Sequence, residues 1–242
     1  MTLIYGHRGA RGEAPENTLP SFRRALAAGV RRVELDLHLS SDQQLMVIHD
    51  PTLKRTTGLG GRVNQHSAAE LMRLDARRNG PEWPENCPIP SLEQLFQHCP
   101  EFEHYQLEVK SGSSGQSRIV LNAVSKLVER FGLQDKVVLT SSSRTLLKTA
   151  RDTAYSLPTG LVEEYGLIDP LKSAVRYGCR YLILNWKLCK PTRIRKAQAQ
   201  GLHVSVWTVN DPTTMIRLAD MGVDSIITDF PHLAIETLHT AQ

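Results

Sequence analysis

A histidine and an arginine follow the first short apolar run of the chain, in the sequence Leu3-Ile4-Tyr5-Gly6-His7-Arg8-Gly9. Histidine titrates near neutral pH, and arginine binds phosphate oxygens through its forked guanidinium group. Gly9 lets the backbone turn sharply and leaves space for a ligand beside it. Proton transfer next to anion binding is the chemistry that a phosphate ester requires, so His7 and Arg8 are candidate site residues.

Two acidic residues and a second histidine lie on a predicted hairpin. Arg32–Leu39 alternates between apolar and polar residues, which predicts a strand, and residues 40–49 predict a turn and a returning strand. Glu34 and Asp36 are two residues apart, so both carboxylates point to the same side of the strand. Folding about the turn brings His49 roughly opposite Asp36, and the hairpin therefore predicts a cluster of these three side chains.

A third carboxylate, that of Glu108, lies at the end of a later predicted strand. It precedes the cationic Lys110 by two residues, the same spacing that separates Glu34 from Asp36. Three oxygen ligands without a cysteine suit a single divalent cation, Mg²⁺ or Ca²⁺. An ion-pair network that joins the acids to Lys110 and Arg8 is the alternative, because converging carboxylates repel unless they are protonated, paired or metal-bound. Residue spacing does not decide between these two interpretations.

The remaining candidates have two interpretations each. His7 and His49 are either a general base and a general acid on opposite sides of a phosphorus centre, or structural residues at strand ends. The nearby acids and Arg8 favour catalysis. Trp207 either walls a pocket for a small polyol or covers the barrel mouth. Residues 15–18, Pro-Glu-Asn-Thr, either place polar groups on the site or only cap the first helix.

Strands and helices alternate along most of the chain. After the two N-terminal strands, strands are predicted at 106–109, 136–140, 159–162, 181–184, 203–207 and 225–228, and helices at 116–131, 143–153, 168–177, 192–200, 212–221 and 231–238. Eight βα units favour a closed (β/α)8 TIM barrel over an open doubly wound sheet. Active sites of this fold lie at the carboxyl ends of the strands, where the candidate residues are predicted to lie.

The pattern weakens between about residues 50 and 105, where prolines are frequent and short helices are predicted only at 68–74 and 91–98. The segment lacks a sizeable set of apolar residues of its own. We therefore interpret it as a small insertion after the second barrel strand, within one domain that spans residues 1–242.

Composition restricts the class of protein. The formal net charge of +4 suits an anionic small substrate, and no basic run is typical of a nucleic-acid-binding tail. No apolar stretch is long enough to span a membrane. The four cysteines form no Cys-x-x-Cys pair, and the first strand begins almost at once without a signal peptide, which predicts a cytoplasmic protein. The sequence does not indicate an oligomeric state.

These motifs together resemble the glycerophosphodiester phosphodiesterases of the bacterial cytosolic type. The resemblance runs nearly end to end in the same order, through His7-Arg8-Gly9, Pro15-Glu16-Asn17-Thr18, Glu34-x-Asp36, His49-Asp50, Glu108-x-Lys110 and Val206-Trp207-Thr208-Val209-Asn210. It implies that Glu34, Asp36 and Glu108 bind one divalent cation and that His7 and His49 are the acid–base pair. It also implies that Arg8 and Lys110 hold the phosphate and that Trp207 borders the glycerol.

The activity implied by this resemblance is hydrolysis of a glycerophosphodiester to sn-glycerol 3-phosphate and an alcohol. One alternative is a lysophospholipase D-like activity on single-chain lipids, for which the insertion offers no obvious acyl-binding stripe. The other is a barrel that binds glycerophosphodiesters without catalysis, and the intact histidines and acids argue against it.

Overall fold

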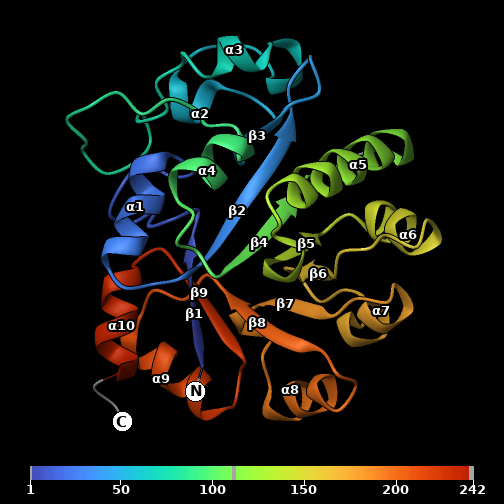
Figure 1. Cartoon of the computed structure of the whole chain (residues 1–242). Coiled ribbons are helices and arrows are strands. Elements are labelled where there is room, and N and C mark those ends of the chain that lie inside the picture. The colour runs from blue at the N-terminus through green and yellow to red at the C-terminus, as the bar shows by residue number, and fades with distance from the viewer. Residues whose placement is uncertain (1, 111–112, 240–242) are drawn as a thin grey trace.

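Eight parallel strands close into a barrel, which confirms the predicted (β/α)8 fold (Figure 1). The computed structural model describes residues 2–110 and 113–239. Neighbouring strands pair in the order β1-β9-β8-β7-β6-β5-β4-β2, and the pairing of β1 with β2 closes the ring. The barrel strands are β1 (Leu3–His7), β2 (Arg32–Leu39), β4 (His104–Val109), β5 (Val137–Ser141), β6 (Thr159–Glu163), β7 (Tyr181–Asn185), β8 (His203–Trp207) and β9 (Ser225–Thr228).

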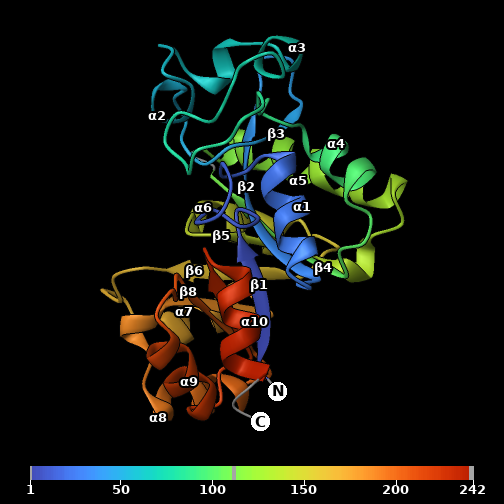
Figure 2. The same cartoon turned by 90° about the vertical axis from the view of Figure 1, so that its left-hand side faces the viewer.

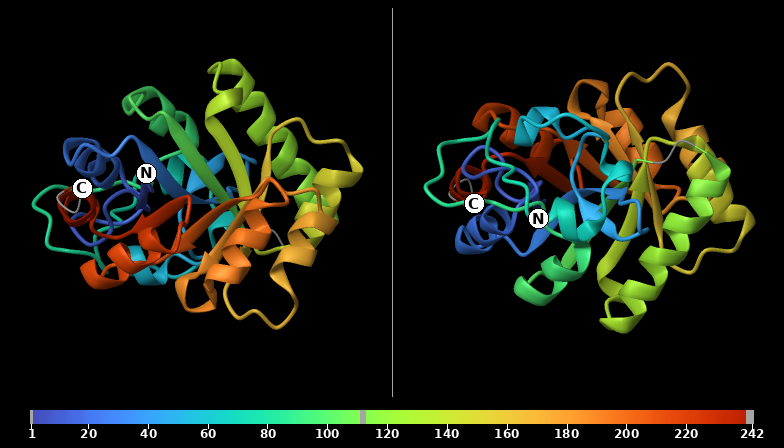
Figure 3. Two further views of the ribbon diagram at one scale, coloured as in Figure 1. Left: turned by 90° about the horizontal axis from the view of Figure 1, so that it is seen from below. Right: turned by 90° about the horizontal axis from the view of Figure 1, so that it is seen from above.

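Helices follow the strands and lie outside the barrel, as the views from below and above show (Figure 3). They are α1 (Leu19–Ala27), α5 (Ser114–Arg130), α6 (Arg144–Asp152), α7 (Pro170–Arg176), α8 (Pro191–Gln198), α9 (Pro212–Asp220) and α10 (Pro231–His239), with 3-10 turns η2 (Gln134–Lys136) and η3 (Trp186–Leu188). α7 begins two residues later than predicted. The side chain of Asp169 accepts hydrogen bonds from the backbone N–H groups of Leu171 and Lys172, which fixes the helix start at Pro170.

Strand β2 places its acids inside the barrel. Val33, Leu35 and Leu37 are buried in the main core together with residues of the surrounding helices. Because successive side chains alternate across a strand, Glu34 and Asp36 point to the opposite side, toward the barrel interior. In an isolated sheet, this alternation would place the polar residues on a solvated face. In a closed barrel, it places them in a buried interior.

The segment between β2 and β4 contains a hairpin and short helices. Strand β3 (Leu45–Val47) pairs antiparallel with β2 and is followed by α2 (Lys54–Thr57), η1 (Val63–Gln65), α3 (Ala68–Leu71) and α4 (Leu92–His98). Helices α2 and α3 lie beyond the carboxyl end of β2 (Figures 1 and 2). The expectation that this segment lacks its own apolar set is wrong. Six of its residues form a separate buried cluster with Met46 and Ile48 of the returning strand: Leu53, Val63, Ala68, Leu71, Ala76 and Ile89.

Aromatic and histidine rings fill the amino-terminal end of the barrel. His104 Nδ1 lies 2.9 Å from Tyr5 Oη, and its Nε2 lies 3.3 Å from Tyr181 Oη. The Tyr181 ring stacks on His104 and also contacts His203, with centroids 5.8 and 4.5 Å apart. Burial lowers the pKa of His104 to about 4, with further lowering from His203 and Arg32.

This histidine should make stability depend on pH. Below its ordinary pKa of about 6.5, His104 binds a proton in the unfolded chain but stays neutral in the folded one until about pH 4. Its contribution is therefore complete above pH 6.5 and is lost as the pH falls toward 4. When the pH is lowered from 6.5 to 4, we expect His104→Gln to lose about 3 kcal/mol less of its free energy of unfolding in urea than the wild type loses. Equal losses in the two proteins would contradict the assignment.

Candidate active site

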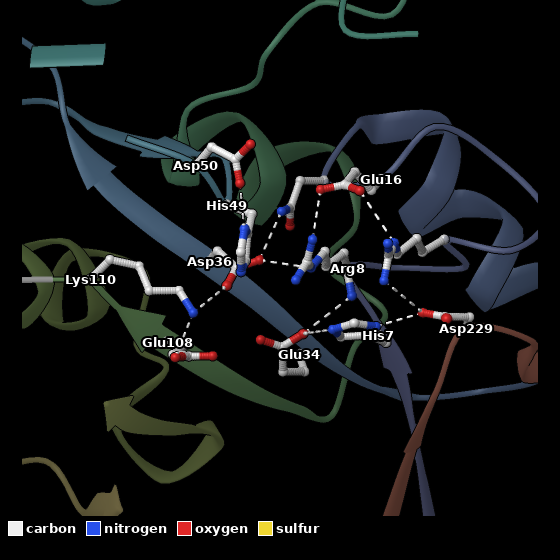
Figure 4. A network of polar contacts seen from close by, with 12 residues as sticks. His7, Arg8, Glu16, Glu34, Asp36, His49, Asp50, Glu108, Lys110 and Asp229 are labelled. Atoms are coloured by element: carbon white, nitrogen blue, oxygen red, sulfur yellow. Dashed lines mark hydrogen bonds and ion pairs between the residues drawn. The ribbon is translucent and has the colours of Figure 1, made fainter. Parts of the chain in front are cut away.

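The carboxyl ends of the barrel strands surround a cavity of about 140 Å³. The structure brings all eight predicted site residues to this end of the barrel, from four strand ends and the β3–α2 connection. Figure 4 shows how they lie, apart from Trp207. Asp36 lies beneath the cavity, fully buried, and its contacts connect it to the others. Seven of the eight line the cavity: His7, Arg8, Glu34, His49, Glu108, Lys110 and Trp207.

The three predicted metal ligands converge. Glu34, Asp36 and Glu108 each place a carboxylate oxygen within 4.8 Å of the other two. The parallel register that sets Asp36 beside Glu108 on neighbouring strands explains this convergence. Burial raises the pKa of Glu34 well above its ordinary value, and the negative charges of Asp36 and Glu108 raise it further.

Two cations hold Asp36 in its ionised form. Arg8 Nε lies 3.0 Å from Asp36 Oδ2, and Lys110 Nζ lies 3.3 Å from Asp36 Oδ1 and 2.6 Å from Glu108 Oε1. Burial alone would raise the pKa of Asp36, but these cations outweigh it and hold the pKa below its ordinary value. The ion-pair network that the sequence left as an alternative is therefore present.

The network carries more negative than positive charge. Its connected ion pairs join six carboxylates to four guanidinium or ammonium groups: Glu16, Glu34, Asp36, Asp50, Glu108 and Asp229, with Arg8, Arg11, Arg55 and Lys110. If all six acids are ionised, two negative charges remain without compensation. Hard oxygen ligands with an excess of two negative charges fit a divalent cation. The ion pairs and a metal are thus compatible rather than exclusive.

His7 ends β1 and is oriented by an acid from β9. His7 Nδ1 lies 2.5 Å from Asp229 Oδ1, and Asn210 Nδ2 donates to Asp229 Oδ2 at 2.8 Å. His7 Nε2 faces the acid cluster, 3.8 Å from Glu34 Oε2. Burial lowers the pKa of His7, although Asp229 opposes this shift, and the lowered pKa favours the neutral imidazole, which can accept a proton.

His49 is held in a similar way on the other side of the cluster. Its Nδ1 lies 2.7 Å from Asp50 Oδ1, and Arg55 Nε donates to Asp50 Oδ2 at 2.7 Å. Its side chain is 32% exposed, whereas that of His7 is 7% exposed. The hairpin register differs by one residue from the expected one, because Ile48 N donates to Asp36 O. His49 nevertheless remains close enough for its charge to lower the pKa of Asp36.

Residues 15–18 do both of the things considered for them. Asn17 Nδ2 donates to Asp36 Oδ2 at 3.0 Å, and Glu16 Oε1 accepts from Arg8 Nη1 at 2.8 Å. Thr18 caps α1 by accepting from the Ser21 backbone N–H. Glu16, Asn17, Asp50 and Asp229 therefore belong to the site, in addition to the eight predicted residues. Their positions beside motif residues or at a strand end are the only sequence signals for them.

Gly9 makes the expected sharp turn, but the space beside it has a different role from the expected one. It adopts φ +86°, and a Cβ atom there would lie 2.5 Å from Ser21 Oγ and 2.6 Å from the Ser21 carbonyl carbon. The missing side chain thus makes room for the first turn of α1, not for a ligand. Close packing of α1 in turn closes the loop after His7, because Ser21 Oγ donates to Arg8 O at 2.9 Å.

Trp207 ends β8 and lines the cavity, and a role of this cavity in binding a polyol stays a prediction. Its indole Nε1 is buried and has no hydrogen-bond partner among the described residues. A buried donor without a partner is costly, so a hydroxyl-bearing ligand would be favoured beside it.

Comparisons with known proteins agree with this architecture. The profile of the "Glycerophosphoryl diester phosphodiesterase family" matches residues 7–233. A glycerophosphodiester phosphodiesterase of Caldanaerobacter subterraneus subsp. tengcongensis is 31% identical over 235 residues, which cover 97% of this chain and 96% of that protein. The crystal structure of a protein from Silicibacter pomeroyi superposes with a TM-score of 0.91 at 27% identity, covering 100% and 94% of the two chains. A phosphodiesterase from Oleispira antarctica, solved with the product sn-glycerol-3-phosphate, gives a TM-score of 0.87 at 24% identity, covering 99% and 97%.

Proposed function

Because the chain belongs to the glycerophosphoryl diester phosphodiesterase family and is a phosphodiesterase, we propose that it hydrolyses glycerophosphodiesters to sn-glycerol 3-phosphate and a free alcohol. One observation carries the proposal. Two histidines, each held through Nδ1 by a carboxylate, lie near three converging acids and two cations. The product complex of the Oleispira antarctica phosphodiesterase supports the same choice of product.

Glu34, Asp36 and Glu108 are the proposed ligands of one divalent cation, Mg²⁺ or Ca²⁺. When bound, such a cation polarises a phosphoryl oxygen and stabilises the charge that develops on it. Arg8 and Lys110 remain at the cluster through their contacts with Asp36 and offset the charge of the phosphate. Trp207 would border the glycerol, where its unpartnered Nε1 can donate to a hydroxyl.

His7 and His49 are the proposed acid–base pair. In both, the carboxylate at Nδ1 fixes the ring and leaves Nε2 for proton transfer. One Nε2 accepts the proton of the attacking oxygen, and the other donates a proton to the departing alkoxide. The bond between phosphorus and the alcohol oxygen breaks as the bond to the attacking oxygen forms. One histidine gains a proton and the other loses one, so the proton count of the pair is unchanged. Each transfer typically contributes 10²–10⁴-fold to the rate.

Asp229 is a positioning residue in this scheme. Asp229→Asn keeps the size of the side chain but removes the charge that orients His7 and raises its pKa. We expect kcat to fall roughly 10–100-fold. In the pH profile of kcat/KM, we expect the limb that reflects titration of His7 to move to lower pH. A fall in rate without any change in the pH profile would mean that Asp229 has only a structural role.

The function itself is tested by product analysis. The purified chain, supplied with Mg²⁺ or Ca²⁺, is incubated with glycerophosphocholine and with lysophosphatidylcholine, and glycerol 3-phosphate, lysophosphatidic acid and choline are quantified. Glycerol 3-phosphate with equimolar choline supports the proposal. Preferential cleavage of the lipid would support the lysophospholipase D-like alternative, and binding without any product would support a non-catalytic barrel.

Location in the cytoplasm is part of the proposal. All four cysteines are free, and Cys87, Cys99 and Cys179 are buried, as expected in a reducing compartment. No helix in the described part of the chain is long and apolar enough to cross a membrane.

A further inference from the structure

The catalytic cavity is too small to hold a whole diester. Its volume of about 140 Å³ is well below the ~300–1,000 Å³ of typical small-molecule pockets. On one side, Trp207, Val162 and Ile183 close it with apolar surface. The other side is formed by His49 and Lys110, and these two residues also line a second cavity.

This second cavity has a volume of about 450 Å³ and shares His49 and Lys110 with the catalytic one. Besides the two shared residues and Pro51, its walls come from the end of β2, the segment that carries η1, and the first turns of α5. A substituent on a phosphate bound between the two shared residues can therefore extend into it without crossing the barrel. Trp207 lines the catalytic cavity and not the second one. The glycerol would therefore lie beside Trp207, and the other alcohol would lie in the second cavity.

The polar groups of the second cavity are cationic or neutral. Arg62 is exposed and has no ion pair among the described residues, and the amides of Asn64 and Gln116 lie in the same wall. Backbone pairing fixes the position of Arg62, because Thr52 and Arg62 form an antiparallel bridge. None of the described residues that line the cavity is Asp, Glu, Phe, Tyr or Trp.

A quaternary ammonium group is bound by carboxylates or by aromatic faces, and this cavity offers neither. Hydroxyl groups and anions suit a guanidinium with neighbouring amides, which supply several fixed donors. We propose that this cavity, centred on Arg62, is the subsite for the leaving alcohol and that it selects hydroxyl-rich or anionic alcohols over choline. The inference rests on the proposed phosphodiesterase function.

The test measures kcat/KM of the full-length chain for glycerol 3-phosphate release from three defined diesters, with inositol, choline or methanol as the alcohol. The wild type should prefer the inositol ester to the choline ester by at least about tenfold. Arg62→Glu should lower the inositol-to-choline ratio by about tenfold or more, and Arg62→Lys should lower it less. The ratio of inositol to methyl ester should also fall, because methanol has no group that reaches Arg62.

Arg195→Glu is the matched control. Arg195 is exposed on α8 and lines neither cavity. Its replacement makes the same change of charge, so both ratios should stay at their wild-type values. A wild-type preference for choline, or equal ratios in wild type and Arg62→Glu, would overturn the subsite while the phosphodiesterase function stands. Absence of turnover with every diester would overturn the function and the subsite together.

Discussion

His49→Ala should lower kcat for glycerophosphocholine by about 10²–10⁴-fold while the protein stays folded. His49 is one-third exposed, so its removal leaves no buried void, and the neighbouring Asp50 keeps its ion pair with Arg55. What is lost is a proton-transfer group beside the phosphate. Because binding of the phosphate depends on other groups, KM should change much less than kcat, and steady-state kinetics measures both.

His7→Ala should reduce kcat to a similar extent but should also reduce stability. Its ring is buried between Asp229 and Glu34, and deletion leaves both carboxylates without this partner. We therefore expect a loss of roughly 2–4 kcal/mol in the free energy of unfolding for His7→Ala. His49→Ala should unfold within about 1 kcal/mol of the wild type.

His232→Ala is the matched control for both substitutions, since this histidine is exposed on α10 and lies outside the site. It should have wild-type kcat. Near wild-type turnover by a folded His49→Ala or His7→Ala protein would refute the acid–base pair, and circular dichroism on the same samples verifies that the variants are folded.

The sequence was sufficient to predict the barrel and the end of it at which the candidate residues meet. Strand β2 shows why, since strict alternation set Glu34 and Asp36 on one face, and the number of βα units turned that face into a barrel interior. Strand ends are the only place where this interior opens. The polar residues at those ends were therefore expected to meet, and His7, Glu108 and Trp207 do line one cavity.

Contacts between distant segments could not be predicted in the same way. Asp229 lies 222 residues from His7, and only closure of β9 onto β1 brings the two together. Arg55 sits on α2, a short helix without a clear periodic signal, yet it binds both Asp50 and Glu16. Such partners depend on how the segment after β3 packs on its own apolar cluster, which was not apparent from its composition.

The acid cluster should have opposite effects on stability and on activity. It lowers the stability of the cation-free protein, but it supplies the proposed cation ligands. Without a cation, Glu34 is buried beside two other acids, which raise its pKa. The unfolded chain ionises this group near its ordinary pKa, so folding becomes less favourable as the pH rises from about 4.5 through the folded pKa. At neutral pH the cluster thus lowers stability, and a divalent cation would remove this penalty.

Glu34→Gln should consequently make the cation-free protein more stable and the enzyme less active. Loss of the charge should raise the free energy of unfolding at pH 7.5, in the presence of a chelator, by about 1 kcal/mol, and this gain should vanish below pH 4.5. Turnover should fall by about 10³-fold, because several kcal/mol of charge stabilisation depend on a correctly held cation. Urea unfolding and product release measure the two effects.

Cation binding provides a readout that is independent of turnover. Mg²⁺ or Ca²⁺ should raise the Tm of the wild type more at pH 7.5 than at pH 5.5, since a raised carboxyl pKa makes protons compete with the cation. The same additions should leave the Tm of Glu34→Gln nearly unchanged. Glu164→Gln is the control, because this acid also lines the catalytic cavity but lies outside the cluster, and it should keep the full cation response. Full turnover after exhaustive chelation, or an equal rise in Tm for wild type and Glu34→Gln, would show that the three acids serve only the ion-pair network.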